Sequence, residues 1–389
     1  MRYGRVRQHR YVFSKLLGNM EKLKIIVTTD FQCDFLAHGI LAGLYESGHA
    51  IYEVPALKSV RGEVDEGYIL PDGQRGVSGP PGYFARPEAH LPPARSYAEA
   101  VELMAKGPDL VVMLSARDYS RRAIHGLSRD AGVNIKSLPL VICEGEDHDY
   151  IDYRLVEEFS PRIFFKREIP RTNPLSAVSN SIHRPVWPLP FSAFTRGYDP
   201  GIDDTKKDYD LFLSLGNTHP LRLTLIKKFL EASDKKGRRS WVATNENVNL
   251  NHPLQKKLKK MLPWGEYIAT QAKSKITASI RGFGRDALHA WEAFSFATLV
   301  LYCDPGIYIP FPFKDRVHCL YFSEDCSEVI DLAETFLEDS TAAWQIAQAG
   351  KRHLHQYHTN KARAEYLINV SRGEAWGKPK QYEEYGICQ

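Results

Sequence analysis

The sequence predicts an α/β protein made of two similar Rossmann-like domains, each built on a parallel sheet with helices on both faces. Its 389 residues exceed the size, roughly 250 to 300 residues, at which a single core stops growing. Short apolar runs typical of buried strands alternate with stretches of helical spacing, both before and after a polar linker at residues 196–208. We therefore expect a first domain at 22–195 and a second at 209–365. A basic extension, residues 1–21, precedes the two domains, and a tail, residues 366–389, follows them. Whether this tail packs back against the first domain is left open.

In the first domain, apolar runs flanked by charge predict strands, and apolar residues at helical spacing predict the helices between them. The predicted strands are residues 22–30, 50–57, 109–117, 138–145 and 162–168. The predicted helices are residues 34–49, 97–106, 121–132 and 153–159. A stretch dense in Gly and Pro, residues 71–94, interrupts this pattern. Such a long loop inside a compact domain is typically functional or mobile, and we interpret it as a lid or as a wall of a binding pocket.

The same alternation returns in the second domain. The predicted strands are residues 210–216, 240–244, 275–282 and 297–303. The predicted helices are residues 219–233, 255–262, 286–296, 328–339 and 342–358. Two units of this kind place the carboxyl ends of their strands toward a shared cleft, which is where ligands bind in open α/β sheets.

Composition excludes several classes of protein. The chain is 43% hydrophobic and 11% aromatic, which is enough core material to argue against disorder. It contains no run of about 18 uncharged apolar residues, so no transmembrane segment is predicted. The net charge of +4, from 51 basic and 47 acidic groups, is too balanced for a polyanion-binding protein. The six cysteines form no CxxC pair, which favours a reducing, cytoplasmic setting. Peripheral membrane contact through the basic N-terminus is left open.

The most informative stretch combines a strand, a glycine-bearing turn and a helix. Gly282 and Gly284 allow the backbone to approach a ligand closely, and Asp286 lies near the expected start of the helix, where free N–H groups attract anions. Glu292 follows on the same helix and is suited to binding both hydroxyls of a ribose. An ordinary strand–turn–helix with a solvated glutamate remains the alternative, because a G-x-G pattern is weak by itself.

Several motifs in the second half resemble the C-terminal half of GT-B glycosyltransferases, in particular the group 1 and spore-maturation relatives. The matching segments are Gly282-Phe283-Gly284, DALHAWEA, ATLVLYCDPG, FPFKDRVHCLYFSEDCSEVIDL and QAGKRHLHQYHTNKARAEYL. The resemblance implies two Rossmann-like domains facing across a cleft, and a hexosyl- or pentosyltransferase that moves a sugar to an acceptor hydroxyl. It implies a nucleotide-diphosphate sugar, such as a UDP-sugar, as the donor and no metal or other cofactor. The acceptor, whether a glycan, a small molecule or a protein, stays open.

The resemblance also implies donor-binding roles for particular residues. Glu292 would hydrogen-bond the ribose, and Arg222 would neutralise the diphosphate, because a guanidinium binds phosphate oxygens through two N–H groups. The remaining residues expected beside the donor are Gly216, Asn217, Thr218, Arg281, Gly282, Gly284, Asp286 and His289. The chain departs from the family at two places. Gly284 or Arg281 stands where the family has a first glutamate, and His289 stands where closer relatives have arginine, so the sugar and the stereochemical outcome stay open.

An acidic cluster follows the predicted strand 138–145, at an end that should border the cleft. We expect Asp147 or His148 to act there as the general base on the acceptor hydroxyl. Asp147 to Asp149 also spell D-x-D, a metal motif of the other large glycosyltransferase fold, but GT-B enzymes usually need no metal, and we predict none. The structural alternative is a cluster that caps the next helix.

Two further patterns are interpreted as solvated surface. His353, His355 and His358 look like a metal cluster, but residues two apart on a helix, such as His353 and His355, point to different faces, so we expect these histidines at the surface. The basic helix predicted at 255–262 resembles a nucleic-acid contact, but one charged helix face is usually only solvated.

Two other functions are left open. The first is a DNA-modifying glycosyltransferase that acts on hydroxymethylated bases, for which duplex binding sensitive to salt would be diagnostic. The second is a non-catalytic GT-B-like module that binds a nucleotide sugar or a protein partner, which the missing first glutamate and His289 keep under consideration. Binding of nucleotide sugars without transfer would identify the second.

Overall fold

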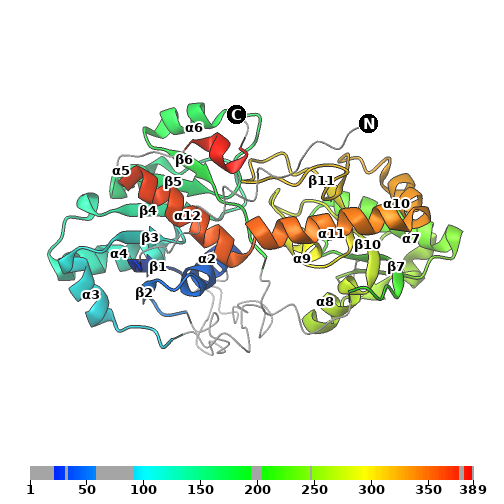
Figure 1. Ribbon diagram of the computed structural model, residues 1–389, viewed down its shortest axis with the longest axis horizontal. Helices are drawn as coiled ribbons and strands as arrows, with labels where there is room; N and C mark the ends of the chain where they lie inside the picture. The colour runs from blue at the N-terminus through cyan, green and yellow to red at the C-terminus, as the bar shows by residue number, and fades with distance from the viewer. Residues whose placement is uncertain are drawn as a thin grey trace, which may run out of the picture.

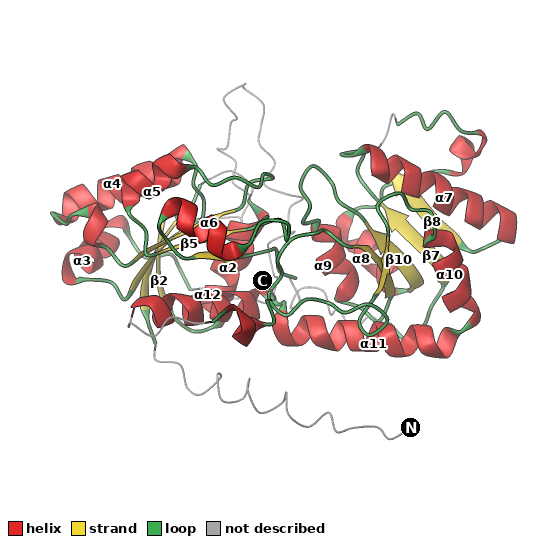
Figure 2. Cartoon of the chain, turned by 90° about the horizontal axis from the view of Figure 1, so that it is seen from above, coloured by secondary structure: helices red, strands yellow, loops and turns green. Residues whose placement is uncertain are grey.

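The protein has two lobes, each with its own parallel sheet (Figure 1). The computed structural model describes residues 22–30, 34–57, 92–193, 204–245, 248–375 and 381–387. The predicted basic extension, most of the Gly/Pro-rich loop and the first part of the predicted linker lie outside these residues. Figure 2 shows helices on either side of the strands in both lobes, so each sheet is covered on both faces.

The first lobe is a six-stranded parallel sheet in the order β2-β1-β3-β4-β5-β6. Its strands are β1 (Lys24–Thr28), β2 (Ala50–Val54), β3 (Leu110–Met113), β4 (Leu140–Glu144), β5 (Ile163–Lys166) and β6 (Val186–Pro188). Its helices are α2 (Phe35–Glu46), α3 (Tyr97–Lys106), α4 (Asp118–Ala131), α5 (Tyr153–Phe159) and α6 (Leu175–Ile182). The predicted strands and helices are confirmed within a few residues. The sequence pattern missed α6 and β6, because a three-residue strand shows no periodicity.

The second lobe repeats this architecture in the order β12-β11-β10-β7-β8-β9, so the predicted α/β fold with two parallel sheets is confirmed. Its strands are β7 (Tyr209–Ser214), β8 (Ser240–Thr244), β9 (Lys259–Lys260), β10 (Ser274–Ser279), β11 (Leu299–Cys303) and β12 (Leu320–Phe322). Its helices are α7 (Pro220–Lys236), α8 (Trp264–Ala272), α9 (Leu288–Phe294), α10 (Val329–Glu338) and α11 (Ser340–Tyr357).

One predicted element of the second lobe is wrong. The segment expected to form a basic helix at 255–262 is a single 3-10 turn, Pro253–Lys257, followed by the edge strand β9. Pro253 and Pro263 bracket the segment and leave little length for a helix. Only its leucines, Leu254 and Leu258, pack against the core, while both lysines of β9 are exposed. Lysines on an edge strand are typical of a sheet that must not pair with another chain.

The last long helix, α12 (Asn360–Ala375), lies against α2 of the first lobe. The chain crosses over just after α11, where His358 and Asn360 exchange backbone hydrogen bonds with Ala193. Gly43 of α2 is the point of closest approach, since a Cβ there would overlap the carbonyl oxygen of Asn360 and lie 2.9 Å from the Cβ of Ala364. Helix α12 therefore depends on a glycine at that position.

The expectation that the histidines near the end of α11 lie at the surface is wrong for two of the three. His358 is fully buried, and only His355 is exposed as predicted, while His353 is half-buried. The Nε2 atoms of His353 and His358 lie 2.8 and 3.0 Å from the carbonyl oxygen of Phe311. Burial, the largest cause, lowers the pKa of His353 to about 4, so this histidine is a neutral hydrogen-bond donor inside the protein.

The lobes also meet directly near the carboxyl end of β5. The amide of Tyr308 donates to the carbonyl of Ile169 (2.9 Å), and the amide of Arg171 donates to that of Gly306 (2.8 Å). These contacts bring the carboxyl ends of β4 and β5 close to those of β7 and β10, which is the region the sequence predicts to hold the ligands. None of the helices in the described ranges is long and apolar enough to cross a membrane.

Candidate functional site

Arg222 is the central cation at the carboxyl ends of β7 and β10. It lies in the first turn of α7, which His219 caps and Pro220 begins. The guanidinium donates to the carbonyl oxygens of Arg281 (2.9 Å) and Gly216 (3.1 Å) and is 8% exposed. Burial lowers its pKa to about 10. Within the described part of the chain no carboxylate pairs with Arg222, so its charge is available to an anionic ligand.

Several buried polar atoms beside Arg222 have no hydrogen-bond partner among the residues that the structure describes. They are Ser214 Oγ, Thr218 Oγ1, Ser279 Oγ, Arg281 Nε and His289 Nε2. Ser214 ends β7 and Ser279 ends β10, and these strands pair in parallel, so both hydroxyls lie at the same edge of the sheet. Buried polar atoms are nearly always bonded in native proteins, and a group left without partners is typical of a site that binds a ligand or ordered water.

His289 cannot replace the cation that its position suggests. Burial and the charge of Arg222 lower the pKa of His289 well below its usual value, so the imidazole is neutral. A neutral ring offers one N–H group to a phosphate oxygen and no net charge. The positive charge at this end of the sheet therefore rests on the arginines.

The glycines of the two facing turns make room for a ligand. A Cβ at Gly282 would lie 2.8 Å from Arg222 Nη2 and 2.9 Å from Thr218 Oγ1. Gly216 lies beside Asn245, whose Oδ1 accepts the amide of Asn217 at 2.6 Å. The structure therefore brings together Gly216, Asn217, Thr218, Arg222 and Gly282 as predicted neighbours. Asn245, which follows β8, completes this group; nothing in the sequence pattern distinguished it from other loop residues.

Glu292 is held by a tyrosine from the preceding helix. The hydroxyl of Tyr267, in α8, donates to Glu292 Oε2 at 2.9 Å, and Glu292 is only 6% exposed. The sequence reading did not predict α8, so it could not anticipate this contact. The bond orients one carboxylate oxygen, and an ionised carboxylate accepts several hydrogen bonds at once.

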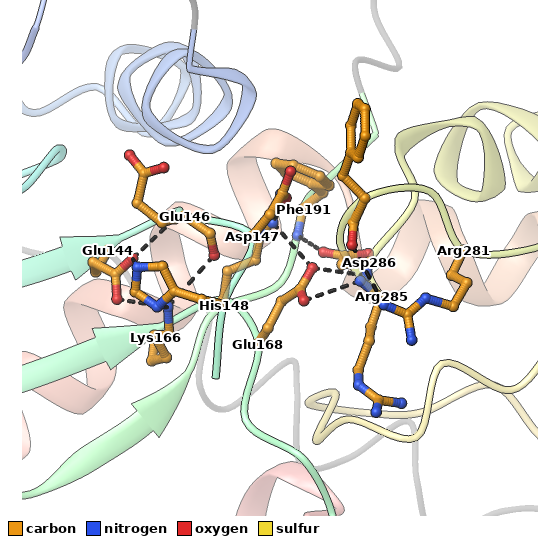
Figure 3. Close-up of polar contacts among 12 residues, drawn as sticks. Glu144, Glu146, Asp147, His148, Lys166, Glu168, Phe191, Arg281, Arg285 and Asp286 are labelled. Carbon is orange, nitrogen blue, oxygen red and sulfur yellow. Dashed lines mark hydrogen bonds and ion pairs between the residues drawn. The ribbon is translucent and has the colours of Figure 1, made fainter. Parts of the chain in front are cut away.

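The turn before α9 is occupied by a residue of the other lobe. Glu168, which follows β5, accepts the amides of Arg285 (2.9 Å) and Asp286 (3.0 Å), as Figure 3 shows. Helix α9 begins only at Leu288. The expectation that a longer helix starts here with free N–H groups for an anion is therefore wrong, because those amides already have a carboxylate. Gly284 belongs to the same contact, since a Cβ there would overlap Glu168 and Asp147.

Asp286 joins the lobes rather than facing the space beside Arg222. Its Oδ2 accepts the amide of Phe191 at 2.6 Å, and its Oδ1 accepts the indole N–H of Trp291 at 2.8 Å. The side chain is buried, and burial raises its pKa to about 6, although the charge of Arg167 opposes the rise. Both carboxylate oxygens are thus bonded within the protein.

We expect the stability of the protein to report the titration of Asp286. Because its folded pKa of about 6 exceeds its usual 3.8, the folded state binds a proton more tightly than the unfolded chain does. Its protonation contributes stability below the unfolded pKa, and about 3 kcal/mol is lost as the pH rises through 6. The measurement compares free energies of unfolding in urea for the protein and Asp286→Asn between pH 4 and pH 8, where a constant difference would contradict the assignment.

The first lobe contributes a charged cluster at the ends of β4 and β5. Lys166 Nζ lies 2.6 Å from Glu144 Oε2, and both side chains are almost fully buried. Burial lowers the pKa of Lys166 and raises that of Glu144, and the opposite charge of each partner counteracts the shift. His148 turns toward this pair (Figure 3). Asp147 instead pairs with Arg167, on the side that faces Gly284. The two predicted acceptor-side residues therefore point in different directions.

The described ranges contain no group of three or more His, Cys, Asp or Glu residues placed to hold a metal ion. The D-x-D sequence at 147–149 does not form one, because Asp147 is engaged by Arg167 and His148 by Lys166. The sequence reading also attached little weight to Arg167 and Glu168. Arg167 pairs with Asp147 of the acidic cluster, and the contact of Glu168 with the opposite lobe had no signal in the sequence.

Comparison with known proteins identifies the class of fold. Residues 227–369 match the model of a family described as glycosyl transferase-like. A glycosyltransferase from Rickettsia africae superposes with a TM-score of 0.57 at 11% identity, over 91% of this chain and 99% of that one. The chain has the GT-B fold. Sucrose-phosphate synthase from Thermosynechococcus elongatus (TM-score 0.54, 12% identity, 92% and 100% covered) agrees with this. A comparison with curated protein sequences finds no match.

A third similar GT-B structure contains a ligand. Anabaena HepE, in complex with UDP, superposes with a TM-score of 0.53 at 12% identity, over 90% of this chain and 100% of that one. The resemblance drawn from the motifs is thereby confirmed at the level of the fold. In this GT-B protein the ends of β4 and β5 face those of β7 and β10, and Arg222 and Asp147 are contributed from opposite lobes.

Proposed function

We propose that the protein transfers a sugar from a nucleotide-diphosphate donor, of the UDP-sugar kind, to an acceptor hydroxyl. The observation that carries this proposal is the buried Arg222, which has no carboxylate partner in the described ranges, together with hydroxyls at the carboxyl ends of β7 and β10 that have no partner there either. Such a site suits a diphosphate, which needs a guanidinium and hydrogen-bond donors. The UDP complex of HepE, a protein of the same fold, supports the choice of ligand class.

Each group of residues then has a role in the donor complex. Arg222 binds the diphosphate and stabilises the charge that develops on it as it leaves. The Thr218 hydroxyl provides a further donor, and Glu292, oriented by Tyr267, accepts the ribose hydroxyls. The guanidinium neutralises charge where other glycosyltransferases use a metal ion, so the transfer requires no metal.

The acceptor side lies on the first lobe. The acceptor oxygen forms a bond to the anomeric carbon, the bond from that carbon to the diphosphate oxygen breaks, and the electron pair leaves with the diphosphate. The proton of the acceptor hydroxyl passes to a base, for which Asp147 and His148 are the two candidates. Hexosyl and pentosyl donors both fit this scheme.

The donor assignment is tested by calorimetric titration with uridine, guanosine, adenosine and cytidine diphosphate sugars. We expect one class to bind, and Glu292→Ala to weaken that binding by about 1–3 kcal/mol through the loss of charge-assisted bonds to the ribose. Glu338→Ala serves as the matched control, because Glu338 is an exposed glutamate of the same lobe at the end of α10. Absence of binding by every class contradicts the proposed function, and binding without transfer to any acceptor would indicate a non-catalytic module.

A further inference from the structure

Of the two candidates on the acceptor side, we propose that Asp147 is the base and that His148 is a positioning residue, held by Lys166 and Glu144. This inference rests on the proposed function and deepens it. It depends on which atoms of each side chain are already engaged within the first lobe and which remain free between the lobes.

Both ring nitrogens of His148 face groups of the protein. Nδ1 lies 3.2 Å from Lys166 Nζ and 3.0 Å from the carbonyl oxygen of Tyr150, while Nε2 lies 3.7 Å from Glu144 Oε1. The ring is stacked on that of Tyr150 at 3.7 Å, with an angle of 7° between the planes. Figure 3 shows the imidazole turned toward Glu144 and Lys166, away from the turn that carries Arg281 and Arg285. An acceptor hydroxyl between the lobes therefore has no free ring nitrogen to meet.

Lys166 selects one tautomer of the imidazole. Its ammonium group is fully buried, forms an ion pair with Glu144 Oε2 at 2.6 Å, and lies 3.2 Å from His148 Nδ1 and 3.4 Å from the carbonyl oxygen of Glu146. A bond from the ammonium to Nδ1 requires a lone pair on Nδ1, so the ring proton is on Nε2, where it faces the carboxylate of Glu144.

The opposite tautomer is disfavoured by two contacts. It would place an N–H group against the ammonium of Lys166 and a lone pair against Glu144 Oε1, and would gain only the neutral bond to the carbonyl of Tyr150. Charge-assisted bonds are about twice as strong as neutral ones. With Nδ1 occupied and Nε2 protonated, His148 has no lone pair with which to remove a proton.

Asp147, unlike His148, has a side-chain atom that can take the proton of the acceptor hydroxyl. Its side chain is 49% exposed, Oδ1 pairs with Arg167, and Oδ2 has no hydrogen bond to any residue that the structure describes. The carboxylate lies beside Gly284 of the opposite lobe, so it borders the space between the lobes. The bonds of His148, together with the ion pair between Arg117 and Glu146 (2.7 Å), hold the loop that carries Asp147. As the acceptor oxygen bonds to the anomeric carbon, Asp147 takes its proton, and the diphosphate leaves with the electron pair.

The first test compares variants by kinetics in the full-length protein. We expect Asp147→Asn to lower kcat by ~10²–10⁴-fold and to alter the pH profile of kcat, while the Kd of the donor stays the same. His148→Asn keeps an acceptor for Lys166 at the place of Nδ1, so its kcat should stay within ~10-fold of the original with the same pH profile. His148→Leu removes that acceptor and should lower kcat further, again with the same pH profile. Wild-type activity in Asp147→Asn, or a pH profile altered by His148→Asn, overturns the proposal.

The second test observes the imidazole directly and needs no substrate. In two-bond ¹⁵N–¹H spectra of the ¹⁵N-labelled protein, the signals of His148 are identified by their absence in His148→Asn. We expect an unprotonated Nδ1 and a protonated Nε2 at neutral pH, and the reverse tautomer in the double variant Glu144→Gln/Lys166→Met, which removes both charges so that neither is left buried alone. A protonated Nδ1 in the original protein overturns the assignment of His148. If no nucleotide sugar binds, the proposed function and the base assignment both fall, while this spectrum still decides the role of His148.

Discussion

We expect Arg222→Ala to weaken the binding of a nucleotide diphosphate by about 100-fold, because charge-assisted bonds to phosphate contribute about 1.5–3 kcal/mol. Arg222 is 8% exposed, and its hydrogen bonds go to backbone carbonyls of the two turns that face each other, at Gly216 and at Ile280–Arg281. The side chain therefore provides the charge of the site and also orders the turns around it. Isothermal titration calorimetry with the nucleoside diphosphate measures the effect.

Two further variants separate these contributions. Arg222→Lys keeps the charge but not the planar fork, so we expect a loss of about tenfold. Arg239→Ala is the matched control, because Arg239 is an exposed arginine just before β8, at the opposite end of the same sheet, where it stacks on Tyr209. Equal losses in Arg222→Ala and Arg239→Ala would show that general charge, rather than this site, binds the ligand. Far-ultraviolet circular dichroism of each variant checks that the second lobe remains folded.

We expect Gly43→Ala to reduce the free energy of unfolding by about 3 kcal/mol, at the upper end of what overpacking usually costs. A methyl group there would overlap the backbone carbonyl of Asn360 and approach Ala364 Cβ, and a backbone atom in a helix cannot rotate away as a side chain can. Helix α12 must then move off α2 or the helices must bend. Urea denaturation followed by fluorescence measures the loss.

A second glycine provides the control for this substitution. Gly265 lies in the first turn of α8, and no atom of another described part of the chain lies within 4 Å of a Cβ built there. Because alanine is the better helix former, Gly265→Ala should leave stability the same or raise it by up to about 1 kcal/mol. A similar loss in both variants would contradict the claim that close packing of α12 on α2 makes Gly43 necessary.

The secondary structure was predictable wherever the pattern of apolar residues was long and regular. Helix α3 was predicted at its observed bounds, Tyr97–Lys106, from the helical spacing of its apolar residues. The structure adds a capping box between Ser96 and Glu99 at its start. The segment at 255–262 failed because four lysines and two leucines fit a helical spacing, although only Leu258 of these leucines packs against the core, directly after a 3-10 turn. The histidines of α11 failed because spacing along a helix does not show what packs against it.

Some contacts of the candidate site could likewise be predicted from the sequence, and others could not. Arg222, Gly216 and Gly282 could be predicted as neighbours, because each follows or faces the end of a parallel strand and such ends share one edge of a sheet. The contact of Glu168 with the amides of Arg285 and Asp286 could not, because it joins residues more than a hundred positions apart in different lobes. No local pattern records such a contact.

The sequence by itself therefore determined two α/β domains with nearly balanced charge, the places where most strands and helices form, and the end of each sheet at which a ligand would bind. These properties depend on periodicity and on the directions of neighbouring strands, which are local. Only the tertiary structure decided that Asp286 joins the lobes, that His148 turns toward Lys166 while Asp147 faces Gly284, and that Arg222 carries a charge without a carboxylate partner in the described ranges. These properties depend on burial and on the groups that packing brings within hydrogen-bonding distance, and both are set by the whole fold.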